Sequence, residues 1–142
     1  MLTNISKKIN DVVTASEQVG EEMNPSYEVI RQAIDSNSIS ELSAEELKNT
    51  QDLFLSGTDK YRELLAQIKG LKAPAKVMGI HKKLEKSFVL YVEGCQEMVD
   101  SINVEANSVN EEMFNASEAK QDEATDSISF CIQRVTQLVL GK

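Results

Sequence analysis

The sequence predicts an all-α protein, an antiparallel up-down-up-down four-helix bundle whose long helices span about residues 2–35, 43–71, 75–106 and 110–140. Apolar residues recur in steps of three and four through all four segments, which is the period of one helix face. Two prolines, six glycines and 5% aromatic residues also suit helices better than a β-sandwich. With 142 residues, 41% of them apolar, the chain is expected to form one domain, 1–142, around one core.

The first helix is expected to continue through Pro25, because the apolar spacing keeps its phase across Asn24-Pro25. Proline removes one backbone hydrogen bond and bends a helix without necessarily ending it. A pair of shorter helices, the second capped by Asn24, is the alternative. The segment Asp35-Ser-Asn-Ser should end the helix.

The second helix should begin with a capping box at Ser43-Ala-Glu-Glu46. In that motif the serine hydroxyl accepts the amide of the fourth residue, whose carboxylate accepts the amide of the serine. Gly57 lies on the apolar face, where glycine costs roughly 1 kcal/mol relative to alanine. We expect an aromatic ring or a neighbouring helix to approach closely there.

The third helix has the most regular apolar face in the chain, and Pro74 just before it suits a helix start. Its members are Val77, His81, Leu84, Phe88, Tyr91, Cys95, Met98 and Ile102. His81 is the only histidine and precedes Glu85 by one turn, but a histidine on such a face is typical of a core position. No P-loop, GxGxxG, GxSxG or Glu-x-x-His pattern occurs, so we expect no catalytic, cofactor or metal-binding residues and no enzymatic activity.

The last turn is placed at residues 107–110, where asparagine and serine cluster and the four helices acquire similar lengths. The helical spacing continues past Ile102 through Ala106, Val109 and Met113, so periodicity alone leaves a turn within 115–127 open. Residues 111–127 are rich in Glu, Asp, Ser and Ala. We expect this first half of the last helix to pack loosely.

Cys95 and Cys131 both lie on apolar faces, where a free thiol packs as a small hydrophobic group. Counting residues in both directions from the last turn places Cys131 of the fourth helix opposite about Ser87 of the third. The two thiols would then lie about 12 Å apart along the bundle, too far for a disulfide.

The same counting brings one polar residue from each helix to a common level, an internal polar level made of Ser16, Tyr61, Ser87 and Cys131. Such a level could line a small cavity. Binding of a small apolar or amphipathic ligand between the bundle helices is therefore our alternative functional hypothesis.

Charged residues are expected to separate between the two ends of the bundle. Each end holds helix N-termini and C-termini, so helix dipoles do not explain the separation. One end gathers Asp35, Glu41, Glu45, Glu46, Asp52, Glu97, Asp100, Glu105, Glu111 and Glu112 against Arg31 and Lys48. The other gathers Lys7, Lys8, Lys69, Lys72, Lys76, Lys82, Lys83, Lys86, Arg134 and Lys142 against Asp11 and Glu85.

The basic end is the predicted partner-binding site, with Lys72, Lys76, Lys82, Lys83 and Lys86 as its candidate residues. A net charge of −8 and a pI near 4.7 argue against nucleic acid and anionic membranes as partners. No apolar run approaches the ~20 residues of a membrane span, and the first residues are too polar for a signal peptide, so a cytoplasmic location is expected. The oligomeric state is left open, because apolar residues outside the predicted core faces could either pad the bundle or form a homodimer face. They are Val89, Leu90 and Leu140.

Two resemblances accompany these patterns. The segment Leu71-Lys-Ala-Pro-Ala-Lys-Val-Met-Gly-Ile-His-Lys-Lys-Leu84, followed by Phe88, Tyr91 and Met98, resembles small uncharacterised helical proteins of Gram-positive bacteria over about a quarter of the chain. Phe114-Asn-Ala-Ser-Glu118 is similar to the aromatic-x-x-x-acid signal of small helical partners of type VII secretion substrates, although their Trp-x-Gly turn is missing. Together with the charge layout, this favours a non-enzymatic bundle acting through protein contacts as an adaptor, a secretion partner or an immunity-type protein.

Overall fold

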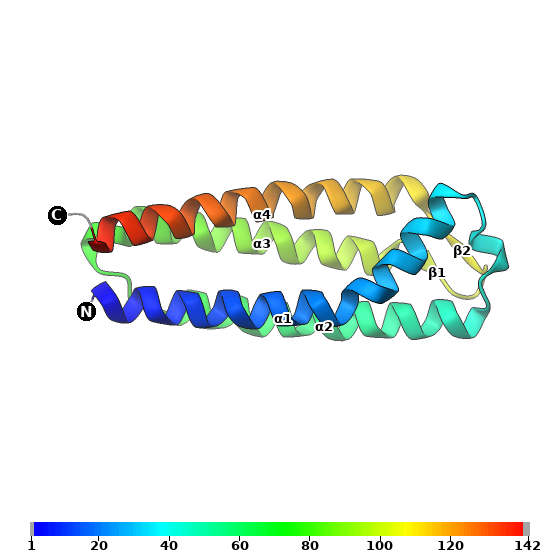
Figure 1. Ribbon diagram of the computed structural model, residues 1–142, viewed down its shortest axis with the longest axis horizontal. Helices are drawn as coiled ribbons and strands as arrows, with labels where there is room; N and C mark the ends of the chain where they lie inside the picture. The colour runs from blue at the N-terminus through cyan, green and yellow to red at the C-terminus, as the bar shows by residue number, and fades with distance from the viewer. Residues whose placement is uncertain (1, 141–142) are drawn as a thin grey trace.

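The computed structural model describes residues 2–140, and the side chains of residues 4–140. Its elements are, in order, α1 (Leu2–Asp35), η1 (Ile39–Glu41), α2 (Ala44–Gly70), η2 (Ala75–Val77), α3 (Met78–Asp100), β1 (Ile102–Asn103), β2 (Ser108–Val109) and α4 (Glu111–Leu140). The four helices lie side by side along one rod, and the start of α1 and the end of α4 lie beside the α2–α3 connection (Figure 1). The predicted antiparallel bundle is confirmed, and the first, second and fourth helices match their predicted bounds within one residue.

The first helix is continuous, with Pro25 inside it. After this proline α1 changes direction and crosses toward the start of α4 (Figure 1). Tyr27 then stacks on Phe114 of α4, with ring centroids 6.1 Å apart and planes inclined by 14°. The prediction of one kinked helix is therefore confirmed, and the kink brings α1 against α4.

The end of α1 is closed by two backbone bonds around Asn37, which adopts a positive φ of 55°. The amide of Ser38 donates to the carbonyl of Ala33 at 2.7 Å, and the amide of Asn37 donates to Ile34 at 3.1 Å. This arrangement satisfies carbonyls that the last helical turn leaves without partners.

The start of α2 carries the predicted capping box. The amide of Glu46 donates to the Ser43 hydroxyl at 3.0 Å, and the amide of Ser43 donates to the Glu46 carboxylate at 3.1 Å. Farther along α2, Gly57 is buried, and the thioether of Met23 from α1 occupies the space that a side chain would need. The close approach expected at Gly57 is thus made by a side chain of the neighbouring helix.

The third helix is shorter than predicted, because it ends at Asp100 and not near residue 106. Ile102 pairs with Val109 and Asn103 with Ser108 in a two-stranded antiparallel hairpin. Both Ile102 and Val109 are buried, so their spacing imitates a continuing helical face although they lie on strands. The chain reverses at residues 104–107, so the turn predicted at 107–110 lies slightly too late, and the alternative within 115–127 is wrong because α4 covers it.

Polar side chains explain why the helix stops. Gln51 of α2 donates from its amide nitrogen to the carbonyls of Val99 at 3.1 Å and Ile102 at 2.8 Å. Asn107 adopts a positive φ of 51°, which reverses the chain, and its side chain donates to the Leu42 carbonyl at 2.9 Å. Asn110 then accepts the amide of Met113 at 3.0 Å and caps α4.

The first half of α4 packs closely, which corrects the expectation of a loose segment. Ser117 and Ala124 are completely buried. An added Cβ on Gly94 of α3 would lie only 3.1 Å from the Ser117 carbonyl oxygen, so the small residues allow the two helices to approach. Phe114 begins the buried face of α4, whereas Met113, which continues the helical spacing of the sequence, is 37% exposed.

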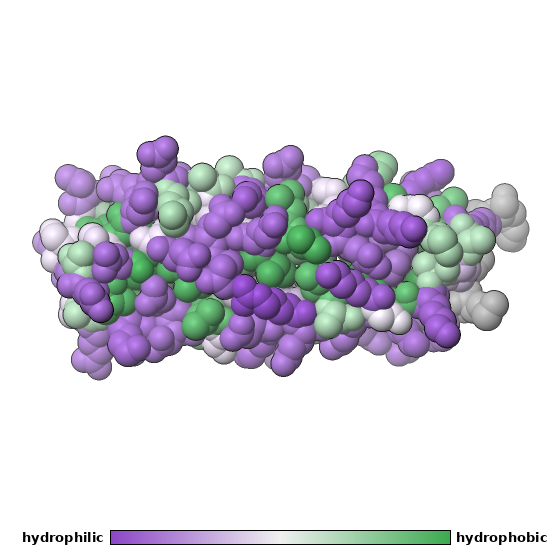
Figure 2. All heavy atoms as spheres, turned by 180° about the vertical axis from the view of Figure 1, so that it is seen from behind, coloured by the Kyte–Doolittle hydropathy of each residue, from purple (hydrophilic) through white to green (hydrophobic). Residues whose placement is uncertain are grey.

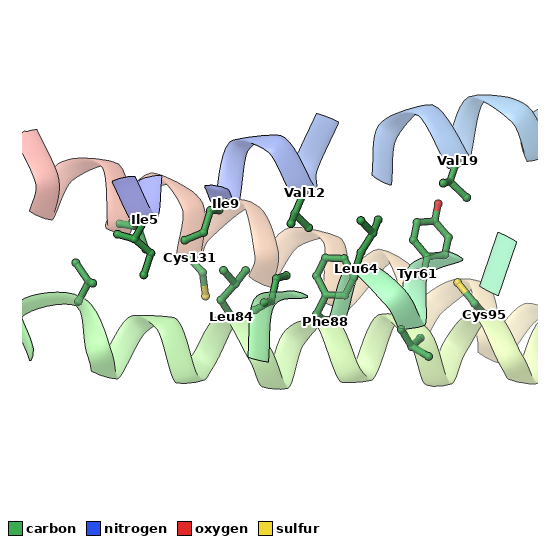
Figure 3. Close-up of a cluster of buried hydrophobic side chains, with 14 residues drawn as sticks. Ile5, Ile9, Val12, Val19, Tyr61, Leu64, Leu84, Phe88, Cys95 and Cys131 are labelled. Atoms are coloured by element: carbon green, nitrogen blue, oxygen red, sulfur yellow. The ribbon is translucent and has the colours of Figure 1, made fainter. Parts of the chain in front are cut away.

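Buried apolar side chains form two clusters, both of which touch Met23. The terminal core, part of which is drawn in Figure 3, contains Ile5, Ile9, Val12, Val19, Tyr61, Leu64, Ile68, Val77, Leu84, Phe88, Val92, Cys95, Cys131 and Val135. The hairpin core contains Ile30, Ala33, Ile34, Ile39, Leu47, Phe54, Met98, Val99, Ile102, Val109 and Phe114. The kink of α1 lies between the two clusters.

Candidate functional site

The five predicted partner-binding lysines are exposed at the end of the rod that holds the α2–α3 connection. They are Lys72 in the connection, Lys76 in η2, and Lys82, Lys83 and Lys86 in the first turns of α3. Lys72 and Lys8 of α1 also line an open hollow of about 390 Å³ between α1 and the α2–α3 connection. Lys142, which the sequence also assigned to this end, lies outside the described residues.

An exposed aromatic ring lies beside these lysines. The ammonium of Lys83 lies 4.8 Å from the ring centroid of Phe130 on α4, and Phe130 is 51% exposed. Arg134 lies one turn farther along α4 and is exposed as well. Phe130 was not predicted from the sequence, although its place just outside the apolar face of α4 indicates it.

The opposite end carries the predicted acidic group. Its two cations each bind a carboxylate within their own helix: Arg31 lies 3.4 Å from Asp35, and Lys48 lies 3.4 Å from Asp52. Further exposed carboxylates at this end are Glu41, Glu45, Glu46, Asp100, Glu105, Glu111 and Glu112. Along the face between the two ends, polar side chains cover most of the surface and apolar ones form a broken band (Figure 2).

The predicted internal polar level divides into two places. The Tyr61 hydroxyl donates to the Ser16 backbone carbonyl at 3.4 Å. Ser87 forms a 2.6 Å hydroxyl bond with Ser127, and both hydroxyls lie beside the Cys131 thiol. Cys131 lies near Ile9 and Leu84 in Figure 3, whereas Tyr61 lies nearer Val19 and Cys95. Ser16 therefore joins Tyr61, and Ser87 joins Cys131, at separate levels.

Two tyrosines and a cysteine form the polar part of the level around Tyr61. Tyr91 donates to the Tyr61 hydroxyl at 3.3 Å, and their rings meet edge to face with centroids 4.9 Å apart. Burial raises the pKa of Tyr61 to about 12 and that of Cys95 to about 12. Burial likewise raises the pKa of Tyr91 and of Cys131. Both cysteines are free and buried, so they remain thiols at neutral pH.

His81 connects α3 to the end of α2. The ring is 3% exposed, and its Nε2 donates to the Ile68 carbonyl at 3.0 Å, which assigns the proton to that nitrogen. Nε2 also lies 3.5 Å from the Glu85 carboxylate. This geometry supports the core role expected for His81, because the ring bonds a carbonyl at the end of a helix.

A cavity of about 130 Å³ lies at the middle of the bundle, where α1 bends. All four helices contribute to its wall: Gly20, Met23, Asn24, Tyr27, Phe54, Thr58, Tyr61, Tyr91, Cys95, Met98 and Gln121. A second hollow of about 260 Å³ shares Gly20, Tyr61 and Tyr91 with the first. Of the predicted internal polar level, only Tyr61 lines both.

The segment with the aromatic-x-x-x-acid form lies against the second half of α1. Phe114 is fully buried, and the guanidinium of Arg31 lies 5.0 Å from its ring centroid. Arg31 also donates to Asn115 at 2.8 Å and to Glu118 at 3.3 Å, and the Tyr27 hydroxyl donates to Glu118. The residues of this motif therefore hold α1 to α4.

Within the part of the chain that the structure describes, no three His, Cys, Asp or Glu residues are grouped so that they could hold a metal ion. Among the same residues, no helix combines the length and apolar character needed to cross a membrane. No protein-family model matches this chain, and neither does any curated protein or solved structure. Proposals about function therefore rest on the geometry of this molecule.

Proposed function

We propose that this protein is a non-enzymatic helical bundle that acts by contact with other proteins, in an adaptor, secretion-partner or immunity-type role. The binding surface is the basic end, with Lys72, Lys76, Lys82, Lys83 and Lys86. Its partner is an acidic protein surface. A cytoplasmic setting is part of the same proposal.

The observation that supports this proposal is the separation of charge between the ends of the rod. Exposed lysines occupy the α2–α3 end, while exposed carboxylates crowd the hairpin end of a chain whose net charge is −8. Separated charges steer a complementary partner to one end and speed its association. An acidic partner would be repelled by the rest of the surface, so only one docking direction remains favourable.

Phe130 and Arg134 add an exposed aromatic ring and a guanidinium group to the lysines of the basic end. Aromatic and arginine side chains are enriched at protein interfaces and among the residues that dominate binding energy. Phe130 is 51% exposed and lies under the Lys83 ammonium, so an incoming carboxylate could meet Lys83 while an apolar group covers the ring. Nucleic acid fits this surface less well, because the acidic remainder of the rod would repel a long polyanion.

The test is a charge reversal with a matched control. The variant Lys82→Glu/Lys83→Glu/Lys86→Glu and the control Lys48→Glu/Lys60→Glu/Arg62→Glu lower the net charge equally, but the control changes α2 away from the basic end. Each protein is immobilised, and bound partners are identified from native lysate and then measured by titration. We expect the α3 variant to lose binding at least tenfold and the control to retain it.

Equal binding by the wild-type protein and the α3 variant would contradict the proposal. Raising the salt concentration should weaken wild-type binding, because exposed charges are screened beyond about 8 Å at physiological ionic strength. If the captured partner is a second copy of this chain, size-exclusion chromatography should show a dimer that the α3 variant does not form.

A further inference from the structure

We propose that the mid-bundle cavity is a binding site for a neutral, ring-sized aromatic molecule carrying one hydroxyl group, of the size of phenol. The cavity measures about 130 Å³. In another protein, an engineered apolar cavity of about 150 Å³ stays dry and binds benzene. The cavity is partly open to the surface, because the exposed Asn24 belongs to its wall.

The sequence leaves this space open at the bend of α1. Gly20 and Asn24 line the cavity on either side of Met23, and Pro25 follows directly and diverts the helix. Glycine at position 20 contributes no side chain, and an added Cβ there would lie 3.5 Å from the Tyr61 hydroxyl. Any larger side chain at position 20 would therefore reduce the volume of the cavity.

The walls of the cavity suit an aromatic ring. Tyr27, Phe54, Tyr61 and Tyr91 present four aromatic rings, and rings favour offset or edge-to-face contacts with other rings. The thioethers of Met23 and Met98 add sulfur contacts, which are also favourable toward aromatic rings. An aliphatic molecule of the same size would gain fewer of these contacts.

The polar groups of the cavity suit a single neutral hydroxyl. No lining side chain among the described residues is charged. The Gln121 amide donates to the Met98 thioether at 3.8 Å, and sulfur is a weak acceptor. A ligand hydroxyl could replace that sulfur as the acceptor. A charged ligand would lose its hydration without meeting an opposite charge.

The experiment uses 4-fluorophenol as the probe, followed by fluorine NMR during titration with the full-length protein. We expect broadening and a shift that give a Kd on the order of 0.1–1 mM, the range that ligand efficiency allows for so small a molecule. 4-Fluorobenzoate, which is charged at neutral pH, should not bind. No change in the 4-fluorophenol signal, or equal binding of 4-fluorobenzoate, would overturn the proposal.

Gly20→Leu is the blocking variant, because its side chain projects into the cavity beside Tyr61. Gly79→Leu is its matched control, since no atom lies within 4 Å of a Cβ placed at Gly79. We expect Gly20→Leu to weaken 4-fluorophenol binding at least tenfold and Gly79→Leu to leave it unchanged, with circular dichroism checking the fold. If Gly20→Leu does not fold, Gly20→Ala, whose methyl meets Tyr61 at ordinary contact distance, should still weaken binding severalfold. Unchanged binding by the folded Gly20 variant would contradict the assignment.

The mid-bundle cavity is separate from the proposed protein-binding surface. Lys82, Lys83 and Lys86 do not line the cavity, so their reversal to glutamate should leave 4-fluorophenol binding intact. Failure of partner binding while 4-fluorophenol still binds would contradict only the proposed protein contact. Failure of 4-fluorophenol binding while the partner still binds would contradict only the cavity assignment.

Discussion

The two halves of the rod hold their helices together in different ways. In the hairpin core, long polar side chains join separate elements: Arg31 reaches Asn115 and Glu118, Gln51 reaches two carbonyls, and Asn107 reaches Leu42. In the terminal core, apolar faces of straight helices pack on one another, and the hollows around the tyrosines remain.

The difference follows from the course of the chain. Straight helices with a regular apolar stripe align mainly by burial, which has no preferred direction. At the hairpin end α1 has bent and α3 has stopped, so the direction of each segment needs bonds of defined geometry. Long polar side chains therefore join separate elements where the chain turns. In the terminal core the polar contacts come from groups embedded in the apolar packing, such as Tyr61 and Ser87, and the hollows around the tyrosines remain.

The largest expected effect is in the hairpin core. Phe114→Ala removes a fully buried ring from between Tyr27 and Arg31 and should lower the free energy of unfolding by about 3–5 kcal/mol, measured by urea denaturation. Phe130→Ala on the same helix is the control, because a ring that is 51% exposed should cost less than about 1 kcal/mol. Similar losses for the two variants would mean that Phe114 does not anchor the crossing of α1.

The terminal core should be the half that is sensitive to alkaline pH. Burial raises the pKa of Tyr61 from 10.0 to about 12, so the folded protein keeps a phenolic proton that the unfolded chain releases. The free energy of unfolding should begin to fall above about pH 9, where the buried Cys95 keeps a proton that the unfolded chain releases, and Tyr61 should add a loss of about 2 kcal/mol between about pH 10 and 12. Urea denaturation at several pH values, with tyrosinate absorbance, measures this loss.

Tyr61→Phe is the control for that pH dependence, because it removes the ionising group and keeps the ring. The variant should show a shallower decline between about pH 10 and 12 than the wild-type protein. Tyr91 and Cys95, whose pKa values burial also raises, should account for part of the remaining decline. Identical pH curves for the wild-type protein and Tyr61→Phe would contradict the burial of this hydroxyl.

The contact between α3 and α4, which passes along both halves, should be sensitive to one methyl group. An added Cβ at Gly94 would lie 2.9 Å from Gln121 Cγ and 3.1 Å from the Ser117 carbonyl oxygen. Since backbone has to move, Gly94→Ala should cost about 1–3 kcal/mol in thermal or urea unfolding. Gly79→Ala on the same helix meets no atom within 4 Å and should cost nothing, so equal losses would exclude a steric cause.

The two halves also differ in how well the sequence predicted their structure. The apolar spacing predicted the straight helices, and counting from the last turn correctly paired Ser87 with Cys131. The hairpin was missed because Ile102 and Val109 are buried at a spacing that continues the helical one. The spacing of apolar residues in one sequence cannot distinguish a continuing helix from such a hairpin when no glycine or proline interrupts it.

The candidate sites were predictable to different degrees. The separation of lysines from carboxylates followed from helix lengths and turn positions, so the basic end was found. A small cavity between the helices was also predicted, but of its four expected lining residues only Tyr61 lines the mid-bundle cavity, because the wall of that cavity depends on the direction in which α1 bends after Pro25. Contacts such as Tyr27 with Phe114 arise only from that bend, and helical spacing carries no information about its direction.

The smallest expected effect tests whether the connections of the hairpin half are set by backbone conformation or by side-chain bonds. Asn37 and Asn107 both have positive φ, 55° and 51°, but only Asn107 has a side-chain bond to another element, the one to the Leu42 carbonyl. Asn37→Gly should therefore raise stability by about 0.5 kcal/mol, because glycine adopts this conformation without strain. Asn107→Gly relieves the same strain but loses a bond of about 1 kcal/mol, so it should lower stability. Urea denaturation of both variants decides the matter, and a stabilising Asn107→Gly would show that the bond to Leu42 contributes little to holding the hairpin.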